Sequence, residues 1–147
     1  DFSGVITYDP QDVTKSSVEV TIKTASIDTG NADRDKHLKS ADFFDAEKYP
    51  EITFKSTRIE KRGSGYVAHG PLTMHGVTKQ VELPFTVTGV INDPWGNTRL
   101  GAEVEPVKVN RQDFGVSWSK ALDGGGLVVS DEVSLELAVE AVKKKAE

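Results

Sequence analysis

The sequence predicts an all-β protein, an antiparallel meander with one inserted α-helix. Short runs along the chain alternate apolar and polar residues with period two, which is typical of strands with one buried face. Turns rich in Gly, Asn, Asp and Pro separate these runs, and one segment, 31–45, has a different spacing of apolar residues. Short antiparallel strands joined in this way form either a sandwich or a barrel. Because closing the sheet removes its unpaired edges, we expect an antiparallel β-barrel.

Length and composition predict a single domain that spans residues 1–147. Hydrophobic residues make up 37% of the chain and charged residues 28%, a balance unlike that of disordered or membrane-spanning chains. No window approaches the roughly 18 consecutive apolar residues of a transmembrane helix, so stable membrane insertion is not expected.

Charge and cysteine content exclude further classes of site. The absence of cysteine excludes disulfides, thiolate catalysis and cysteine-ligated metal sites. A formal net charge of −5 disfavours nucleic acid as a partner, because phosphate binding needs a basic surface. The basic run at 143–145 is interpreted as a solvated tail, so we give little weight to nucleic acid or an anionic membrane as its partner.

The first two strands are predicted at 4–8 and 17–24. In the second of these, Val18, Val20 and Ile22 share one face and polar residues occupy the other. A proline follows the first run closely, and the segment between the two runs is polar. The two strands are therefore expected to form a hairpin and to lie antiparallel.

The predicted helix covers residues 31–45. Charged residues fill its first part, and less polar residues recur at spacings of one, three and three, namely His37, Leu38, Ala41 and Phe44. Thr29 or Asn31 is the expected N-cap. The helix is expected to end by Tyr49, because the residue before a proline is disfavoured in the helical region.

The remaining strands follow in a meander, each bounded by a turn signal. They are predicted at 52–60, 66–70 with a continuation at 72–74, 81–88, 104–109 and 133–140. The turns between them are expected at 62–65, 75–76 and 92–97, with a break at 110–113 and a glycine-rich loop at 124–126.

Five motifs occur in order along the chain. They are ASIDTGNADRDKHL at 25–38, DFFD at 42–45, YPEITFKS at 49–56, LTMHGVTK at 72–79 and NRQDFG at 110–115. Together they resemble the signatures of the YceI-like family. The similarity runs from the first residue to about Glu140.

This resemblance implies a lipocalin-like barrel of eight antiparallel strands, whose hydrophobic tunnel takes an isoprenoid chain such as a polyprenyl lipid or an isoprenoid quinone. It also implies a bacterial protein that is periplasmic or secreted and uses no cofactor, with any export signal removed before Asp1. Family members carry about one or two further strands before the position of Asp1, including an aromatic-rich one. We therefore expect an unpaired sheet edge, and homodimerisation or strand exchange across that edge is a hypothesis.

Apolar residues along the chain are candidates for lining such a tunnel. The candidate ligand-binding residues are Val20, Ile22, Leu38, Phe43, Phe44, Phe54, Leu72, Phe85, Phe114 and Trp118. A small barrel can be packed solid or hold one ligand, and the two are alike in sequence, so the tunnel is implied by the resemblance.

Two charged pairs lie within the family-like motifs: Arg34 with Asp35, and Arg111 with Asp113. An arginine at the barrel mouth could hold an oxyanionic or quinone head group through its bidentate donors. Alternatively, each pair is an internal ion pair that fixes the helix to the barrel. Both interpretations stay open.

Catalytic and metal-binding patterns are not found. The three histidines, His37, His69 and His75, lack the spacing of a metal site. The acidic cluster at 28–35 departs from the EF-hand spacing and is better explained by helix capping. The letters DFG at 113–115 occur without the other kinase motifs. No catalytic residue is predicted.

Three functions from different classes remain after these exclusions. The first is a binding or carrier protein that sequesters an isoprenoid-type lipid without catalysis. The second is an enzyme acting on such a lipid, which requires a paired acid and base or a metal. The third is a structural or interaction barrel with a packed core. The first is favoured because no acid–base pair is found and the family resemblance supplies the ligand class.

Overall fold

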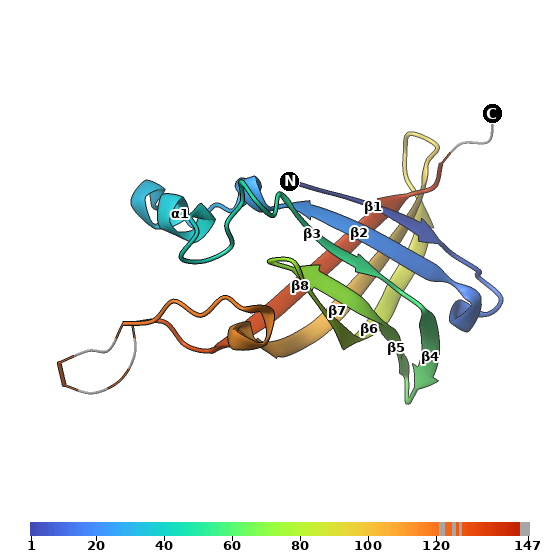
Figure 1. Ribbon diagram of the computed structural model, residues 1–147. Coiled ribbons are helices and arrows are strands. Elements are labelled where there is room, and N and C mark those ends of the chain that lie inside the picture. Colours follow the sequence, from blue (N-terminus) through green and yellow to red (C-terminus); the bar gives the residue numbers. More distant parts are fainter. Residues whose placement is uncertain (121–122, 125, 127, 145–147) are drawn as a thin grey trace.

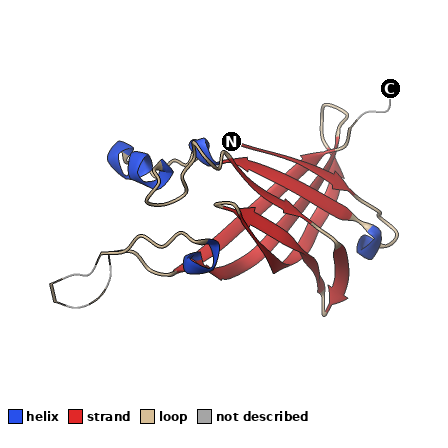
Figure 2. Ribbon diagram, in the orientation of Figure 1, coloured by secondary structure: helices blue, strands red, loops and turns tan. Residues whose placement is uncertain are grey.

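The computed structural model of the chain describes residues 1–120, 123–124, 126 and 128–144. Its main element is one antiparallel sheet that curls strongly, so that its two ends turn toward each other (Figures 1 and 2). The strands are β1 (Phe2–Thr7), β2 (Ser17–Lys23), β3 (Glu51–Lys55), β4 (Arg58–Arg62), β5 (Gly65–Met74), β6 (Val77–Asn92), β7 (Thr98–Asn110) and β8 (Glu132–Val142). The helical elements are α1 (Ala32–Lys39) and the short 3₁₀ turns η1 (Val13–Lys15), η2 (Thr24–Ser26) and η3 (Arg111–Phe114).

The strands pair in the order β1-β2-β3-β5-β6-β7-β8, and β4 pairs with β5 beside this path. Every pairing is antiparallel. The predicted all-β class, the meander and the single α-helix are confirmed. Within the described residues, β1 pairs only with β2 and β8 only with β7, so the curled sheet is open between these two strands. An open edge was expected, and the structure places it here.

Strand register puts apolar residues of neighbouring strands side by side on one face. On one half of the sheet, Val20 pairs with Phe54 and Phe54 pairs with Leu72. On the other half, Phe85 pairs with Val104, which pairs with Leu137. We call this apolar face the inner face, because residues from β2 to β6 on it pack against one another as a core. The period-two alternation that predicted the strands is therefore realised as a single apolar layer.

Two clusters of buried residues form the packed core. One contains Phe54, Ile59 and Ala68 and lies where β3, β4 and β5 meet. The other contains Phe43, Phe114 and Val116 and lies at the end of the sheet that carries α1 and η3 (Figure 1). Leu72 packs against both clusters and so joins them.

The helix is shorter than the prediction of 31–45. Asn31 caps it as expected, since its side chain accepts a hydrogen bond from the backbone N–H of Arg34 at 3.0 Å. The helix ends at Lys39, because Ser40 is extended and directs both its backbone N–H and its hydroxyl to the carbonyl of His37. The following residues form turns that bury Phe43, so the apolar residues after Ser40 belong to the core and not to a longer helical face.

The predicted strand 52–60 is two strands in the structure. Ser56 interrupts it, because its backbone N–H and its hydroxyl both bond to the backbone of Val18, at 2.9 Å each. Beyond this point the chain leaves β2, and β4 pairs with β5 alone. The later strands are longer than predicted, since β6 and β7 continue past β-bulges at Val87/Gly89 and Val104/Val107, where the alternation of the sequence is interrupted.

Candidate functional site

The inner face of β6, β7 and β8 is an apolar surface that remains partly accessible. We call it the concave trough, because it lies on the inner side of the curled sheet (Figures 1 and 2). Its residues are Leu83, Phe85, Val87, Leu100, Ala102, Val104, Leu135, Leu137 and Val139. Each of them is half-buried. The buried hydrophobic residues of the described chain lie instead in β3 to β5, in η3 and in the segments beside it. Leu83 and Phe85 pack against one of the buried clusters, and the curled sheet leaves the rest of this apolar layer half-covered, which is the usual property of a binding surface.

Aromatic contacts tie together the end of the sheet that carries α1. The ring of His37 makes edge contacts with Phe43 at 4.9 Å and with Trp118 at 4.8 Å, measured between centroids. Its Nε2 lies 2.9 Å from a carboxylate oxygen of Asp42. Since Trp118 follows η3 and His37 belongs to α1, these contacts hold α1 against the chain that leaves β7.

The turn between β5 and β6 also ties this end together. Nδ1 of His75 lies 3.1 Å from the carbonyl oxygen of Phe114, and the His75 ring lies 4.8 Å from that of Tyr49. The carbonyl of Tyr49 in turn accepts a hydrogen bond from the buried hydroxyl of Thr24 at 2.8 Å. The turn therefore connects the segments before β3 and after β7, and gives His75 a structural role.

The ten candidate ligand-binding residues fall into different surroundings. Phe43, Phe54 and Phe114 are buried members of the two packed clusters. Leu38, Phe44, Leu72, Phe85 and Trp118 are half-buried against those clusters, and Val20 and Ile22 are half-buried on β2. Among these ten, Phe85 alone belongs to the concave trough. The inner residues of β7 and β8 were missed as site residues, although the alternation at 133–140 placed that strand correctly.

Arg111 is buried, and its ion-pair partner differs from the predicted one. The residue is 3% exposed, and its guanidinium donates to the carbonyls of Ser130 at 2.9 Å and Val116 at 2.7 Å. Its carboxylate partner is Asp131, at 3.3 Å, whereas Asp113 is exposed. The structure thus places Arg111 in an internal ion pair with Asp131 and not with Asp113, because Asp113 of η3 is exposed while Asp131, just before β8, lies alongside. This pair joins the segments beside β7 and β8 and does not fix the helix to the sheet.

Arg34 and Asp35 do not form the internal pair that was one of the two interpretations. Arg34 donates to the hydroxyl and the carbonyl of Thr29, each at 2.8 Å. Asp35 accepts from the backbone N–H of Thr29 at 2.8 Å and from its hydroxyl, and that hydroxyl hydrogen bond holds the pKa of Asp35 below its ordinary value. Both residues therefore fasten α1 to the loop before it, since helix geometry turns them toward Thr29.

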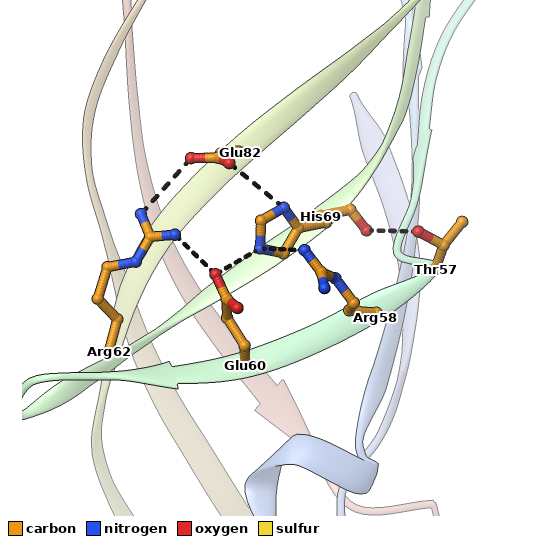
Figure 3. Close-up of polar contacts among 6 residues, drawn as sticks. All are labelled: Thr57, Arg58, Glu60, Arg62, His69 and Glu82. Carbon is orange, nitrogen blue, oxygen red and sulfur yellow. Dashed lines mark hydrogen bonds and ion pairs between the residues drawn. The ribbon is translucent and has the colours of Figure 1, made fainter.

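A polar cluster occupies the outer face where β4, β5 and β6 meet (Figure 3). His69 lies between two carboxylates, with Nε2 2.8 Å from Glu60 and Nδ1 3.5 Å from Glu82. Arg62 contacts the same two carboxylates, at 2.6 Å and 3.5 Å, and Arg58 lies 3.4 Å from the His69 ring. The His69 side chain is only 14% exposed.

The chemistry of this cluster is that of an ion-pair network. Hydrogen bonds from His69 and then Arg62 lower the pKa of Glu60, so its carboxylate remains an acceptor at neutral pH. Charged groups from three strands are thereby linked on one surface, which fastens β4 to its neighbours. Within the described part of the chain, no group of three or more His, Asp or Glu side chains is arranged to hold a metal ion.

Two hollows on the surface are poor matches for an apolar ligand, because most of the residues that line them are charged or polar. One, of about 480 Å³, is lined by Ala32, Asp35, Lys36, Lys39 and Ser40. The other, of about 640 Å³, is lined by Asp1, Phe2, Ser3, Thr21, Lys23 and Glu51. The helices of the described residues are all too short or too polar to cross a membrane.

Comparisons with known proteins agree with the geometry. The sequence model of one protein family, described as the YceI-like domain, matches residues 1–141. The chain is 45% identical over 145 residues to a UPF0312 protein of Serratia proteamaculans and 43% identical to the protein YceI of Escherichia coli O157:H7. In both cases the alignment covers 99% of this chain and 72% of the relative.

Solved structures show the same fold. The crystal structure of the Campylobacter jejuni YceI protein superposes with a TM-score of 0.85 at 34% identity, covering 99% of this chain and 82% of that one. The crystal structure of Burkholderia cenocepacia BcnA gives a TM-score of 0.81 at 28% identity, covering 96% and 84%. A family match over nearly the whole chain, relatives above 40% identity and a shared curled sheet agree with one another, and the chain belongs to the YceI-like family.

Proposed function

We propose that the protein binds the chain of an isoprenoid-type lipid, a polyprenyl lipid or an isoprenoid quinone, along the concave trough, and sequesters or carries it. The observation that supports this most is the half-buried apolar layer on β6, β7 and β8. A packed core would bury these residues, and a soluble surface would expose polar ones. An apolar chain laid along this layer supplies the missing packing partner.

Burial of apolar area is sufficient to supply the affinity. Covering about 300 Å² of apolar surface contributes on the order of 7 kcal/mol, at roughly 25 cal/mol per Å², before the cost of ordering the ligand. The arginines that were candidates for gripping a head group, Arg34 and Arg111, are engaged with Thr29 and with the segment before β8. We therefore expect selectivity to depend on the length and width of the lipid chain.

A periplasmic or secreted location and binding without catalysis are both part of the proposed function. Resemblance to the family supports a periplasmic or secreted location. The binding described here needs no acid–base pair, metal or cofactor, because no covalent bond changes. The polar cluster around His69 lies on the outer face, opposite the trough, and takes no part in it.

Native mass spectrometry of the purified protein, with organic extraction of bound lipid, tests this proposal. We expect an isoprenoid lipid at about one per chain. Added polyprenol or isoprenoid quinone should raise Tm, since a ligand at a hundredfold excess over Kd stabilises by about 2.7 kcal/mol. A protein that carries no lipid and whose Tm is unchanged by either addition contradicts the proposal.

A pair of neighbouring substitutions locates the ligand. Ala102→Trp places a large ring in the trough, between Val87 and Val139, whereas Glu103→Trp places the same ring on the outer face. We expect the first variant to lose bound lipid and the second to keep it, with both folded by circular dichroism. Equal lipid content in the two variants would show that the ligand does not lie in the trough.

A second candidate function is assembly through the open sheet edges. Among the described residues, β1 and β8 each present one side without a strand partner, and an unpaired strand edge is a template for pairing with another chain. This candidate is the homodimer or strand exchange expected from the sequence. Size-exclusion chromatography with light scattering tests it, and a monomer at high concentration contradicts it.

A further inference from the structure

Exposed apolar residues gather at the hairpin between β6 and β7. Trp95 is 77% exposed and Ile91 is 62% exposed, and Val90 is also exposed. The exposed Val142 of β8 lies in the same outer-face row as Ile91, with Arg99 between them, because Ile91 pairs with Arg99 and Arg99 pairs with Val142. Val90 lies on the inner face beside them, since it pairs with Leu100. We call Val90, Ile91, Trp95 and Val142 the hairpin patch.

Several hydrogen bonds to one buried carboxylate hold the turn that carries Trp95. The carboxylate of Asp93, whose side chain is 4% exposed, accepts hydrogen bonds from the backbone N–H groups of Trp95 at 2.9 Å and Asn97 at 2.8 Å. It also accepts from the Asn97 side chain at 3.0 Å and from Arg99 at 2.7 Å. Burial raises the pKa of Asp93, but these hydrogen bonds outweigh it and hold the pKa far below its ordinary value. The backbone of Trp95 is thus held in place, so that binding through the exposed indole costs little backbone entropy.

The charged groups named around the hairpin patch carry a small positive excess once the ion pairs are counted. Arg99 binds the carboxylates of both Asp93 and Glu140, at 2.7 Å and 2.6 Å. Lys143 lies beside the hairpin, because its backbone N–H donates to the carbonyl of Thr98 at 2.8 Å. Lys143 and Lys144 are exposed, and within the described ranges neither has a carboxylate partner. The sequence suggested a solvated tail here, and Lys143 and Lys144 are exposed, with the backbone of Lys143 bonded to the hairpin.

The hairpin patch also adjoins the concave trough. Val90 pairs with Leu100, and Leu100 pairs with Ala141, which continues the inner-face row formed by Val87, Ala102 and Val139. The hairpin lies at the end of the sheet opposite α1 (Figures 1 and 2). The apolar row of the trough therefore reaches the patch at Val90, at the end that α1 does not cover.

We propose that the hairpin patch docks the protein on the surface of a membrane that contains anionic lipids. Trp95 and Ile91 enter the boundary between head groups and acyl chains, where an indole is favoured. Lys143 and Lys144 lie at the level of the anionic head groups, each favoured by about 1 kcal/mol. That a lipid then passes between the membrane and the trough rests on the proposed function, whereas docking itself does not.

Vesicle sedimentation tests the docking. The protein is mixed at low salt with vesicles of phosphatidylcholine and phosphatidylglycerol, or of phosphatidylcholine alone. We expect binding to the anionic vesicles, weakened by salt and by the double change Lys143→Glu, Lys144→Glu. Trp95→Ala should lower the affinity by about tenfold or more, since a Trp buries some 150–250 Å². Phe2→Ala is the matched control, because Phe2 of β1 is 76% exposed and lies outside the patch.

A spectroscopic measurement places the indole. Brominated lipids quench a tryptophan that enters the bilayer boundary, and we expect quenching of the wild type that disappears in Trp95→Phe, leaving the signal of Trp118. The proposal is overturned if the wild type stays in the supernatant with anionic vesicles at low salt, or if Trp95→Ala binds them as tightly as Phe2→Ala does. A protein partner would then be the remaining occupant of the patch.

The two proposals fail separately. Trp95→Ala should retain co-purified isoprenoid while losing vesicle binding, and Ala102→Trp should lose the isoprenoid while still binding vesicles. Loss of vesicle binding in both variants would contradict docking through the patch alone. Absence of isoprenoid in the wild type, with vesicle binding intact, would remove the carrier function and leave the docking surface in place.

Discussion

The guanidinium of Arg111 lies 3.3 Å from the carboxylate of Asp131, and the backbone N–H of Arg111 donates to the carbonyl of the same residue at 2.9 Å. The guanidinium also holds the carbonyls of Val116 and Ser130. One buried side chain thus joins the chain leaving β7 to the chain entering β8. The packed cluster beneath α1 depends on this junction, since Phe114 and Val116 lie directly after Arg111.

Replacing Arg111 with methionine should destabilise the protein strongly. Arg111→Met removes three donors from a buried site, among them the one to the buried carbonyl of Val116, so we expect the free energy of unfolding to fall by about 3 kcal/mol. Urea denaturation followed by circular dichroism measures it. Asp113→Asn, at an exposed carboxylate in the same 3₁₀ turn, should change stability by less than about 0.5 kcal/mol. An unchanged denaturation midpoint for Arg111→Met would contradict the assigned role.

The turn at Gly76 should tolerate alanine less well than the turn at Gly96. Both glycines have positive φ, +72° and +84°, and alanine at either costs about 1 kcal/mol. A Cβ at Gly76 would lie 2.5 Å from Cε1 of Tyr49, whereas at Gly96 it meets no described atom within 4 Å. We expect Gly76→Ala to lower the free energy of unfolding by about 3 kcal/mol in total. In a double-mutant cycle, adding Tyr49→Ala should recover part of the stability that Gly76→Ala loses beyond Gly96→Ala. If the losses of Gly76→Ala and Tyr49→Ala are additive, no steric conflict exists between these two positions.

The polar cluster on the outer face predicts a pH dependence of stability. The pKa of Glu60 is lowered below its ordinary 4.5 by His69 and Arg62, so the folded state binds this proton less readily than the unfolded state. The resulting stabilisation is fully present above about pH 5 and is lost as the pH falls through the lowered folded pKa. Thermal melts of Glu60→Gln between neutral and acidic pH should therefore show a shallower decline than the wild type.

The control for this pH dependence is Glu136→Gln. Glu136 is exposed on β8 and, among the described residues, has no ion-pair partner. Its variant should follow the wild-type curve. If Glu60→Gln and Glu136→Gln decline in parallel, the network around His69 does not couple protonation to folding.

The cap of α1 predicts a local effect. Asn31→Ala removes the acceptor for the backbone N–H of Arg34, which typically costs a helix about 1 kcal/mol. Amide hydrogen exchange within Ala32–Lys39 should become roughly fivefold faster, while exchange in β5 and β6 stays the same. Asp33→Ala, at an exposed residue in the first turn of the same helix, is the control. Equal exchange in the two variants would show that Asn31 does not limit opening of the helix.

Local features of the sequence predicted most of the strands but not the length of the helix. Period-two alternation placed β2, β6 and β8, and the turn signals at Gly76 and Asn92 marked two hairpins correctly. The helix was overextended, because the apolar residues Phe43 and Phe44 fit a helical spacing and yet pack as turns. The hydroxyl of Ser40 competes for the carbonyl of His37, a local alternative that spacing alone does not weigh.

The sequence by itself determined which residues of each strand share a face, since alternation depends only on neighbouring positions. It also carried the family signatures, and with them the fold. Only the tertiary structure decided the partner of Arg111, the exposure of Trp95 and the half-burial of the inner residues of β7 and β8. Each of these depends on which distant segments meet when the sheet curls. Alternation with period two predicts which face of the sheet a residue lies on. Whether that face is buried depends on contacts between residues far apart in the chain.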